Sequence, residues 1–266
     1  MNAPPLIRWW MPPLLAVQFL TRLPVPGLNG LTAEQARYGL SRSVIWFPLV
    51  GTLVGGITAA VLVAGAQIWP VTIAVILALA IEARLTGAFH EDAVADFCDA
   101  FGGGLDAQST RRIMKDSRIG TYGALGLFFA VALRAALLIA LMTALPQHIM
   151  VIALVASACF GRMMAVTMMA LVAPAPREGD GLAKDVGERT GYADLFFAAL
   201  IAAPVMALFA GYQPFSALLA LGGTGIFLFW FRAFLLRRIN GSTGDCLGFA
   251  AYAGQLIILL AALAGQ

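Results

Sequence analysis

The amino-acid sequence predicts an all-α protein: a polytopic membrane bundle of about seven transmembrane helices, with a short N-terminal re-entrant or interfacial helix. Composition is the first reason, because 61% of the 266 residues are hydrophobic, only 12% are charged and the mean hydropathy is +0.86. A soluble domain has about a quarter charged residues. The second reason is the presence of long stretches without Asp, Glu, Lys or Arg, at 43–81, 135–161, 195–231 and 246–266.

Individual helices follow from where these stretches are interrupted, since one crossing needs about 20 apolar residues. Uncharged turns divide three of the stretches, at 64–70, 145–150 and 211–215. The apolar stretch from Trp9 to Leu20 is too short to cross, so we expect it to be re-entrant or interfacial. The predicted spans, in order, are 44–66, 69–88, 119–143, 148–172, 194–211, 214–234 and 246–264.

The distribution of charge predicts the orientation of these spans. Nearly every charge lies in the segments 1–42, 82–118, 173–194 and 232–245. Of the 17 Lys and Arg residues, only Arg134 and Arg162 fall deep inside a predicted span. Because basic loops stay in the cytoplasm, we expect the charged segments and the N-terminus there, and the C-terminus outside after seven crossings.

Some classes of partner receive no support from the composition. A net charge of +3 is weak evidence for a nucleic-acid partner, so we expect none, whereas contact with membrane lipid is expected. Cys98, Cys159 and Cys246 are widely separated and contain no CxxC pair, which favours neither a disulfide framework nor a zinc site.

The most unusual stretch for a membrane protein is FHEDAVADFCDAFGGG at 89–104, with the carboxylates of Glu91, Asp92, Asp96 and Asp99. If it continues the preceding helix, Asp92, Asp96 and Asp99 share one face, at i, i+4 and i+7. Like charges on one face repel, and a hard cation would offset this. Mg²⁺ binds through one or two carboxylates plus substrate phosphates, so we predict a Mg²⁺ site with these four residues as candidate ligands. A solvated acidic face is the alternative.

Basic residues follow within twenty positions, in RRIMKDSRIGTYG at 111–123. Carboxylates that hold Mg²⁺ beside guanidinium and ammonium groups are suited to a diphosphate, because Arg binds phosphate oxygens bidentately. The alternative is a juxtamembrane cluster that contacts lipid head groups. The cations concerned are Arg111, Arg112, Lys115 and Arg118.

A third polar element, NGSTGDCLG at 240–248, precedes the last span. A Gly-rich turn that opens a helix presents free N–H groups to an anion, although Asp245 is also a suitable helix cap. Two arginines within spans need partners, because a charge deep in a membrane is costly. We expect Arg162 to reach a polar cavity near the acidic stretch, and Arg134 either to pair with Glu82 or to extend to the interface.

Together these motifs resemble one family, cobalamin synthase (adenosylcobinamide-GDP ribazoletransferase). The resemblance is carried by GAFHEDAVADFCDAFGG, RRIMKDSRIGTYGALGL and INGSTGDCLGFA, in matching order, and by the earlier FLTRLPVP and WFPLVGTLVGG. It covers the chain from about residue 17 to the C-terminus. Ala93, Ala100 and Asn240 stand where the family pattern has glycine, which affects local backbone geometry more than the carboxylates.

The resemblance implies a single integral membrane catalytic domain over 1–266, in the bacterial inner membrane, with its active site facing the cytoplasm. The enzyme would join adenosylcobinamide-GDP to α-ribazole, or to its 5′-phosphate, in a Mg²⁺-assisted phosphoryl-type transfer that releases GMP. A homo-oligomer is compatible with the sequence.

The hypothesis for the site gives each candidate a role. Asp92 and Asp96 hold Mg²⁺ against the diphosphate, and Asp99 and Glu91 complete the metal site. Lys115, Arg118 and Arg162 neutralise charge on the departing GMP, and Asp245 is a candidate proton acceptor. The remaining expected binding residues are Arg111, Asn240, Thr243 and Gly244.

Three other functions remain open at this point. CDP-alcohol phosphotransferases also place Asp residues at helical spacing, but their DGxxAR element is absent. Prenyltransferases use two DxxxD motifs, and this chain has one. An ion-coupled transporter would show repeats and broken helices near the midplane, and no repeat is evident here.

Overall fold

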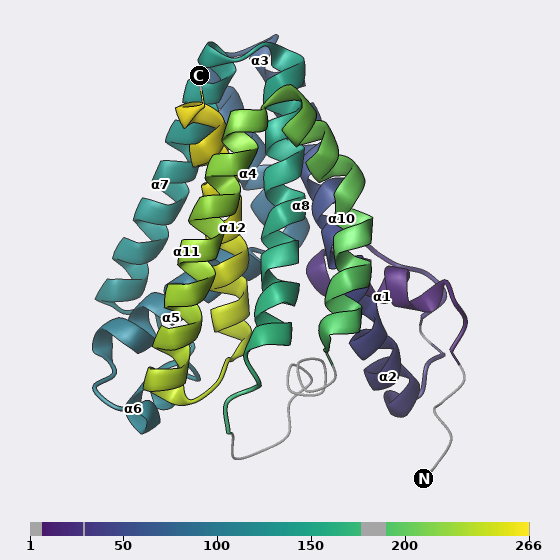
Figure 1. The fold of residues 1–266 in the computed structure, drawn as a ribbon, viewed down its shortest axis with the longest axis vertical. Coiled ribbons are helices and arrows are strands. Elements are labelled where there is room, and N and C mark those ends of the chain that lie inside the picture. Colours follow the sequence, from purple (N-terminus) through teal and green to yellow (C-terminus); the bar gives the residue numbers. More distant parts are fainter. Residues whose placement is uncertain (1–6, 29, 177–189, 266) are drawn as a thin grey trace.

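The computed structural model describes residues 7–28, 30–176 and 190–265, and this part of the chain is helical without a β-sheet (Figure 1). A 3₁₀ turn at Val44–Trp46 joins α2 to α3. The helices are α1 (Met11–Leu20), α2 (Ala33–Ser43), α3 (Phe47–Ala66), α4 (Val71–Thr86), α5 (Phe89–Gly103), α6 (Ala107–Ile113), α7 (Thr121–Ala144), α8 (Gln147–Leu171), α10 (Tyr192–Tyr212), α11 (Pro214–Ile239) and α12 (Gly244–Ala264).

The predicted helical membrane bundle is confirmed. Within the described residues, six helical segments are long and apolar enough to cross a membrane, and the pair α4 and α5 makes a seventh if it is taken as one span. The six are the continuous segment Ala33–Ala66 and the helices α7, α8, α10, α11 and α12. α1 is apolar but has only 10 residues, as expected for a segment too short to cross.

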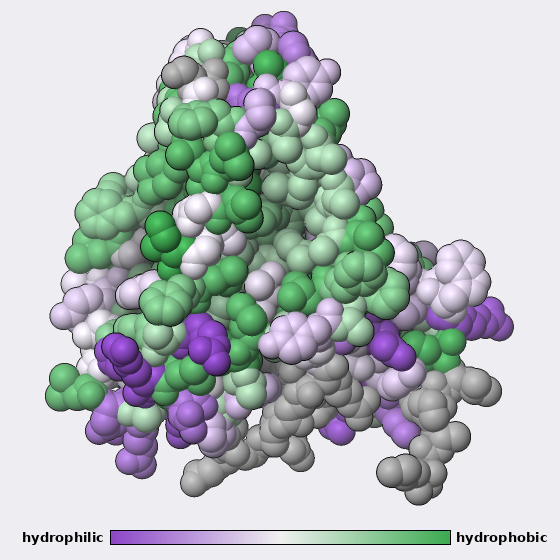
Figure 2. Space-filling model, viewed as in Figure 1, coloured by the Kyte–Doolittle hydropathy of each residue, from purple (hydrophilic) through white to green (hydrophobic). Residues whose placement is uncertain are grey.

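The charged segments gather at one end of the bundle. In Figure 1 the turns α3–α4, α7–α8 and α10–α11 lie at the upper end with the C-terminus, whereas α1, α2, α5 and α6 lie at the lower end. Figure 2 shows hydrophilic side chains on the lower end and apolar ones over the flanks. Most of the expected charged segment 173–194 lies outside the described residues.

The acidic stretch is a helix, as a shared face of its carboxylates requires, but it does not continue the second span in a straight line. α5 departs from α4 at an angle of 88°. Gly87 and Ala88 form the corner, with left-handed φ values of 71° and 56°. Glycine adopts this conformation freely, whereas alanine pays about 1–2 kcal/mol for it. The corner turns α5 across the lower end of the bundle in Figure 1, and α5 stops at Gly103, as predicted.

Small residues bring the central helices together. α8 packs against α3 on one side and α12 on the other. A Cβ at Gly51 of α3 would meet the backbone of Ala158, and a Cβ at Gly161 would meet the backbone of Ala251 on α12. In lipid, no hydrophobic effect drives helices together, so their association depends on van der Waals packing, which this close approach of the backbones improves.

A buried ion pair ties α4 to α7. Nη2 of Arg134 donates to both carboxylate oxygens of Glu82, at 2.9 and 2.8 Å. The hydroxyl of Thr58 on α3 donates to the same carboxylate at 2.8 Å, and the guanidinium lies 5.8 Å from the ring centre of Tyr252. Of the two alternatives for Arg134, the structure therefore shows pairing with Glu82.

Candidate functional site

A cavity of about 560 Å³ opens at the charged end of the bundle. Its lining comes from three distant parts of the sequence, and two of these parts supply four of the predicted residues, Arg111, Lys115, Thr243 and Asp245. Three of the lining side chains are cationic. Its lining residues are Gln108, Arg111, Arg112, Met114, Lys115, Ala175, Pro176, Thr243 and Asp245.

The basic wall is held in place by hydrogen bonds to the end of α11. Nη2 of Arg111 donates to the carbonyl of Ile239 at 2.9 Å, and Nη2 of Arg238 donates to the carbonyl of Gly104 at 2.7 Å. The carboxylate of Asp106 caps α6 by accepting from the N–H of Ser109 at 2.7 Å. The first of these bonds occupies Nη2 of Arg111. Lys115 is exposed and lines the cavity.

The opposite wall is built from two loops that exchange backbone hydrogen bonds. The N–H of Ser242 donates to the carbonyl of Ala173 at 2.9 Å, and the N–H of Ala175 donates to the carbonyl of Ser242 at 2.8 Å. Gly241 makes this approach possible, because at φ 153° any Cβ would collide with the backbone of Ala175. Thr243 then caps α12 by accepting from the N–H of Cys246 at 3.4 Å. The start of α12, with Asp245, is thereby fixed at the cavity.

The acidic helix contributes carboxylates beside this wall. Asp92 is exposed and Asp96 partly buried. Burial, followed by the charges of Asp92, Asp245 and Asp99, raises the pKa of Asp96 to about 6. Asp96 therefore lies close enough to the carboxylates of α5 and of α12 to feel their repulsion, which is the electrostatic environment that a divalent cation would relieve.

Asp99 has a structural contact of its own. Its two carboxylate oxygens accept hydrogen bonds from the backbone N–H groups of Gly120, at 2.6 Å, and Gly123, at 2.7 Å. Both are donors at the N-terminus of α7, where a carboxylate is stabilising. The structure therefore uses Asp99 to attach α7 to α5.

The four predicted carboxylates do not form one ligand cluster. In the part of the chain that the structure describes, no three His, Cys, Asp or Glu side chains come together as a metal-binding group. Glu91 is half-buried and lies near the charges of Arg134 and Arg162. Asp92 and Asp96 remain available as oxygen donors, which fits Mg²⁺ bound through one or two carboxylates and completed by substrate phosphates.

Besides the carboxylates of α5, four predicted residues do not line the large cavity. Arg118 is 87% exposed and binds Asp116, with Nη2 2.6 Å from Oδ2, and its hydrogen bonds lower the pKa of Asp116 to about 2. Asn240 is exposed and ends α11 in a left-handed conformation. Arg162 and Gly244 line a second, smaller cavity. Conversely, sequence reasoning missed three uncharged lining residues: Gln108 on α6, and Ala175 and Pro176, whose segment pairs through its backbone with Ser242.

Packing between α5 and α12 sets the relative position of the carboxylates, and it is testable. A Cβ at Gly248 would collide with Ala93, so Gly248→Ala should push α5 away from α12. We expect the variant to fold and to lose roughly 10- to 100-fold in turnover, since displacements of about 1 Å have effects of this size. Gly225→Ala is the control, because a Cβ there meets nothing. Equal activity of the two variants would contradict this role of the contact.

Comparisons with known proteins agree on one family. The model of the family described as cobalamin-5-phosphate synthase matches residues 12–263. An adenosylcobinamide-GDP ribazoletransferase of Leptothrix cholodnii is 39% identical over 262 residues, covering 94% of each chain. A protein of the same name from Ralstonia pickettii is 36% identical and covers 99% of this chain and 98% of its own. One from Vibrio cholerae is 34% identical over 94% of this chain and 92% of its own.

No solved structure matches the chain significantly. The family match spans nearly the whole bundle, including the acidic helix, both walls of the cavity and the spans that support them. The chain therefore belongs to the cobalamin-5-phosphate synthase family.

Proposed function

We propose that this protein joins adenosylcobinamide-GDP to α-ribazole, or to α-ribazole 5′-phosphate, and releases GMP. The relatives bear the name of this reaction. The observation that carries the proposal for the site is the cavity at the charged end, where Arg111, Arg112 and Lys115 face the start of α12. A cavity of about 560 Å³ has the size of a small-molecule site, and its cations suit a diphosphate.

The roles of the residues follow from their positions. Bound by Asp92 and Asp96 together with the diphosphate, Mg²⁺ would supply Lewis-acid neutralisation of phosphate charge. Arg111 and Lys115 bind phosphate oxygens, and the N-terminus of α12 at Thr243 and Gly244 offers N–H groups to the same anion.

The transfer itself requires one proton acceptor. A ribose hydroxyl of the acceptor attacks the phosphorus on the cobinamide side, the P–O bond to GMP breaks and the hydroxyl proton is released. Asp245 lines the cavity, so we assign the proton to its carboxylate. Lys115 and Arg111 stabilise the negative charge that moves onto GMP.

We also propose that the bundle lies in the bacterial inner membrane with its charged end in the cytoplasm. The described basic segments around α2 and α6 lie at the lower end of the bundle in Figure 1, the end that holds the large cavity, and basic loops remain on the cytoplasmic side. Both substrates would then reach the site from the cytoplasm.

The experiment that tests the function is product formation by the purified protein in detergent, given adenosylcobinamide-GDP and α-ribazole with and without Mg²⁺. We expect cobalamin and GMP in equal amounts, and only with the metal. Absence of product from folded protein would overturn the reaction. Product formation after chelation of divalent ions would overturn the metal assignment alone.

The basic wall gives a prediction of its own. Lys115 is exposed and lines the cavity, so Lys115→Ala should leave folding unchanged while lowering kcat/KM for adenosylcobinamide-GDP by roughly 10- to 100-fold, the effect of losing one charged contact to phosphate. Arg237→Ala is the matched control, because Arg237 is exposed at the same end but does not line the cavity. Steady-state kinetics of the two variants decide the matter, and indistinguishable values would remove Lys115 from the site.

A further inference from the structure

Two side chains that line the large cavity have no role in the proposed transfer. They are Gln108 and Arg112, one turn apart on α6. Both residues are exposed, and in the described part of the chain neither side chain makes a hydrogen bond to another residue. Their donors and acceptors are therefore available to a ligand that occupies the cavity.

The cavity extends along α6. Four residues on and just after this helix line it along one helical face, at i, i+3, i+4 and i+7: Gln108, Arg111, Arg112 and Lys115. One end of this face meets the start of α12, where the hydroxyl of Thr243 donates to Sδ of Met114 at 3.1 Å. Gln108 precedes Met114 by six residues, which places it about 9 Å farther along at 1.5 Å per residue. This separation is comparable with that between the phosphate and the base of a nucleotide.

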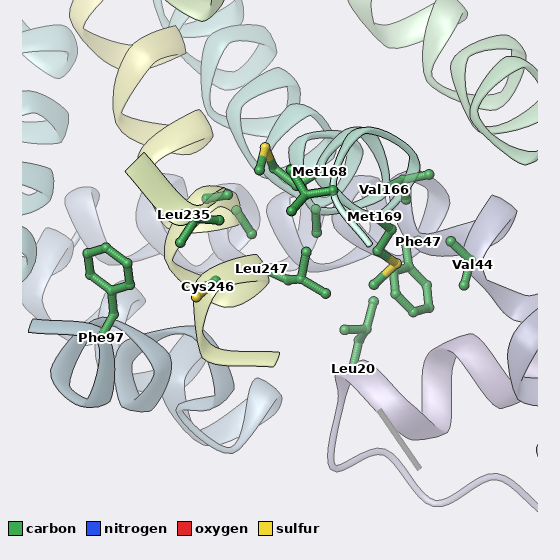
Figure 3. Close-up of a cluster of buried hydrophobic side chains, with 14 of the residues drawn as sticks. Leu20, Val44, Phe47, Phe97, Val166, Met168, Met169, Leu235, Cys246 and Leu247 are labelled. Carbon is green, nitrogen blue, oxygen red and sulfur yellow. The ribbon is translucent and has the colours of Figure 1, made fainter. Parts of the chain in front are cut away.

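The end of the cavity at α12 is the one suited to phosphate. Lys115 and Asp245 line it, and Asp245 lies within range of the charge of Asp96, a proposed metal ligand. Figure 3 shows Cys246 and Leu247, in the first turn of α12, among the buried side chains of one apolar cluster. This packing fixes the start of α12 in the core. The diphosphate and its metal therefore belong at this end, and the opposite end is left for the base.

The chemistry of the opposite end matches guanine. Arginine presents N–H donors in a fixed fork and has no acceptor. Guanine offers two adjacent acceptors, O6 and N7, which arginine binds bidentately, whereas adenine has an amino group in place of O6. The guanidinium of Arg112 lies within electrostatic range of Asp106, which precedes α6, so it is directed toward the end of the cavity at Gln108. The amide of Gln108 is uncharged, as expected beside a base instead of a phosphate.

We infer that the donor nucleotide lies along α6, with its diphosphate at the start of α12 and its guanine bound by Arg112 through O6 and N7. This inference rests on the proposed function, which makes a GDP derivative the donor. Arg112 is then a specificity-determining residue, which selects the nucleotide without taking part in the transfer. A cavity of about 560 Å³ accommodates a nucleotide, and the much larger corrinoid remains outside it.

The test is binding of GMP and AMP to the purified protein in detergent, measured by calorimetry with Mg²⁺ present. The two nucleotides share the ribose and the phosphate, so a difference between them reports the base. We expect the wild type to bind GMP about tenfold more tightly than AMP, the discrimination given by one bidentate contact. Arg112→Ala should weaken GMP binding to the level of AMP and leave AMP binding nearly unchanged.

A second variant separates recognition of the base from attraction to phosphate. Glutamine binds adenine bidentately, so Arg112→Gln should shift the preference toward AMP, which loss of a phosphate contact would not do. The matched control is Arg237→Ala, because Arg237 is exposed at the same end but does not line the cavity, and it should keep the wild-type preference. Equal weakening of GMP and AMP by Arg112→Ala would assign Arg112 to phosphate and overturn the inference.

The binding test does not depend on turnover. Formation of cobalamin by a protein that binds GMP and AMP equally would overturn this inference and leave the proposed function standing. A preference for GMP that depends on Arg112, in folded protein that forms no cobalamin, would support the base contact and overturn the proposed reaction.

Discussion

Asp92→Ala is expected to lower turnover at least about 100-fold while the protein remains folded in detergent. The carboxylate is exposed on α5, so its removal leaves no cavity in the core. It lies beside Asp96, and we assign both to the metal that neutralises the diphosphate. Loss of one electrostatic stabiliser at a reacting phosphate or carbonyl commonly lowers rates 10²- to 10³-fold.

The measurement is the rate of GMP release as Mg²⁺ is varied, together with a thermal melt of the same preparation. Glu34→Ala is the control, because Glu34 is an exposed acid in the first turn of α2 and should behave like wild type. Near-normal turnover by Asp92→Ala would contradict the assignment of Asp92 to the metal site. A loss reversed by high Mg²⁺ would support it further, since it would show weakened metal binding.

Glu82→Leu is expected to destabilise the protein by about 3–5 kcal/mol, the usual effect of removing one partner of a buried ion pair. Arg134 is only 2% exposed and Glu82 only 3%. Without the carboxylate, the guanidinium would lose both hydrogen bonds, at 2.9 and 2.8 Å, in a region without water to replace them. Unfolding by heat in a mild detergent would report the loss.

The double variant separates the ion pair from simple packing. Glu82→Leu combined with Arg134→Leu removes both charges, so it should recover much of the lost stability, as expected when the penalty comes from an uncompensated charge. If the double variant is less stable than the wild type by the sum of the two single effects, the two side chains act independently and the ion pair is not the cause.

The spans were predictable because membrane crossing depends on length and apolarity, which the sequence displays directly. Predicted 119–143 became α7 at Thr121–Ala144, and predicted 148–172 became α8 at Gln147–Leu171. The corner at 87–88 was not predictable in the same way. Ala88 is left-handed there, which alanine's own preference opposes, so the cause lies in tertiary packing around Gly87 and Arg22.

The site was predictable in part for an equally physical reason. Arg111, Lys115, Thr243 and Asp245 share one cavity, because charged and Gly-rich segments must leave the membrane at the same end and so gather there. Contacts within that end are a different matter. Arg118 turns to Asp116, two positions away, and Asp99 turns to the backbone of α7. A side chain can bind such a local partner instead of a ligand, and the residue type alone does not reveal which of the two it binds.

The right-angled corner before α5 has a consequence for depth. Along a helix that crosses the bilayer, residues four apart differ in depth by about 6 Å, at 1.5 Å per residue. α5 is turned by 88° from α4, so Asp92 and Asp96 lie at nearly the same level instead. A diphosphate held through both carboxylates would therefore lie along α5, across the end of the bundle, instead of along the axis of α4.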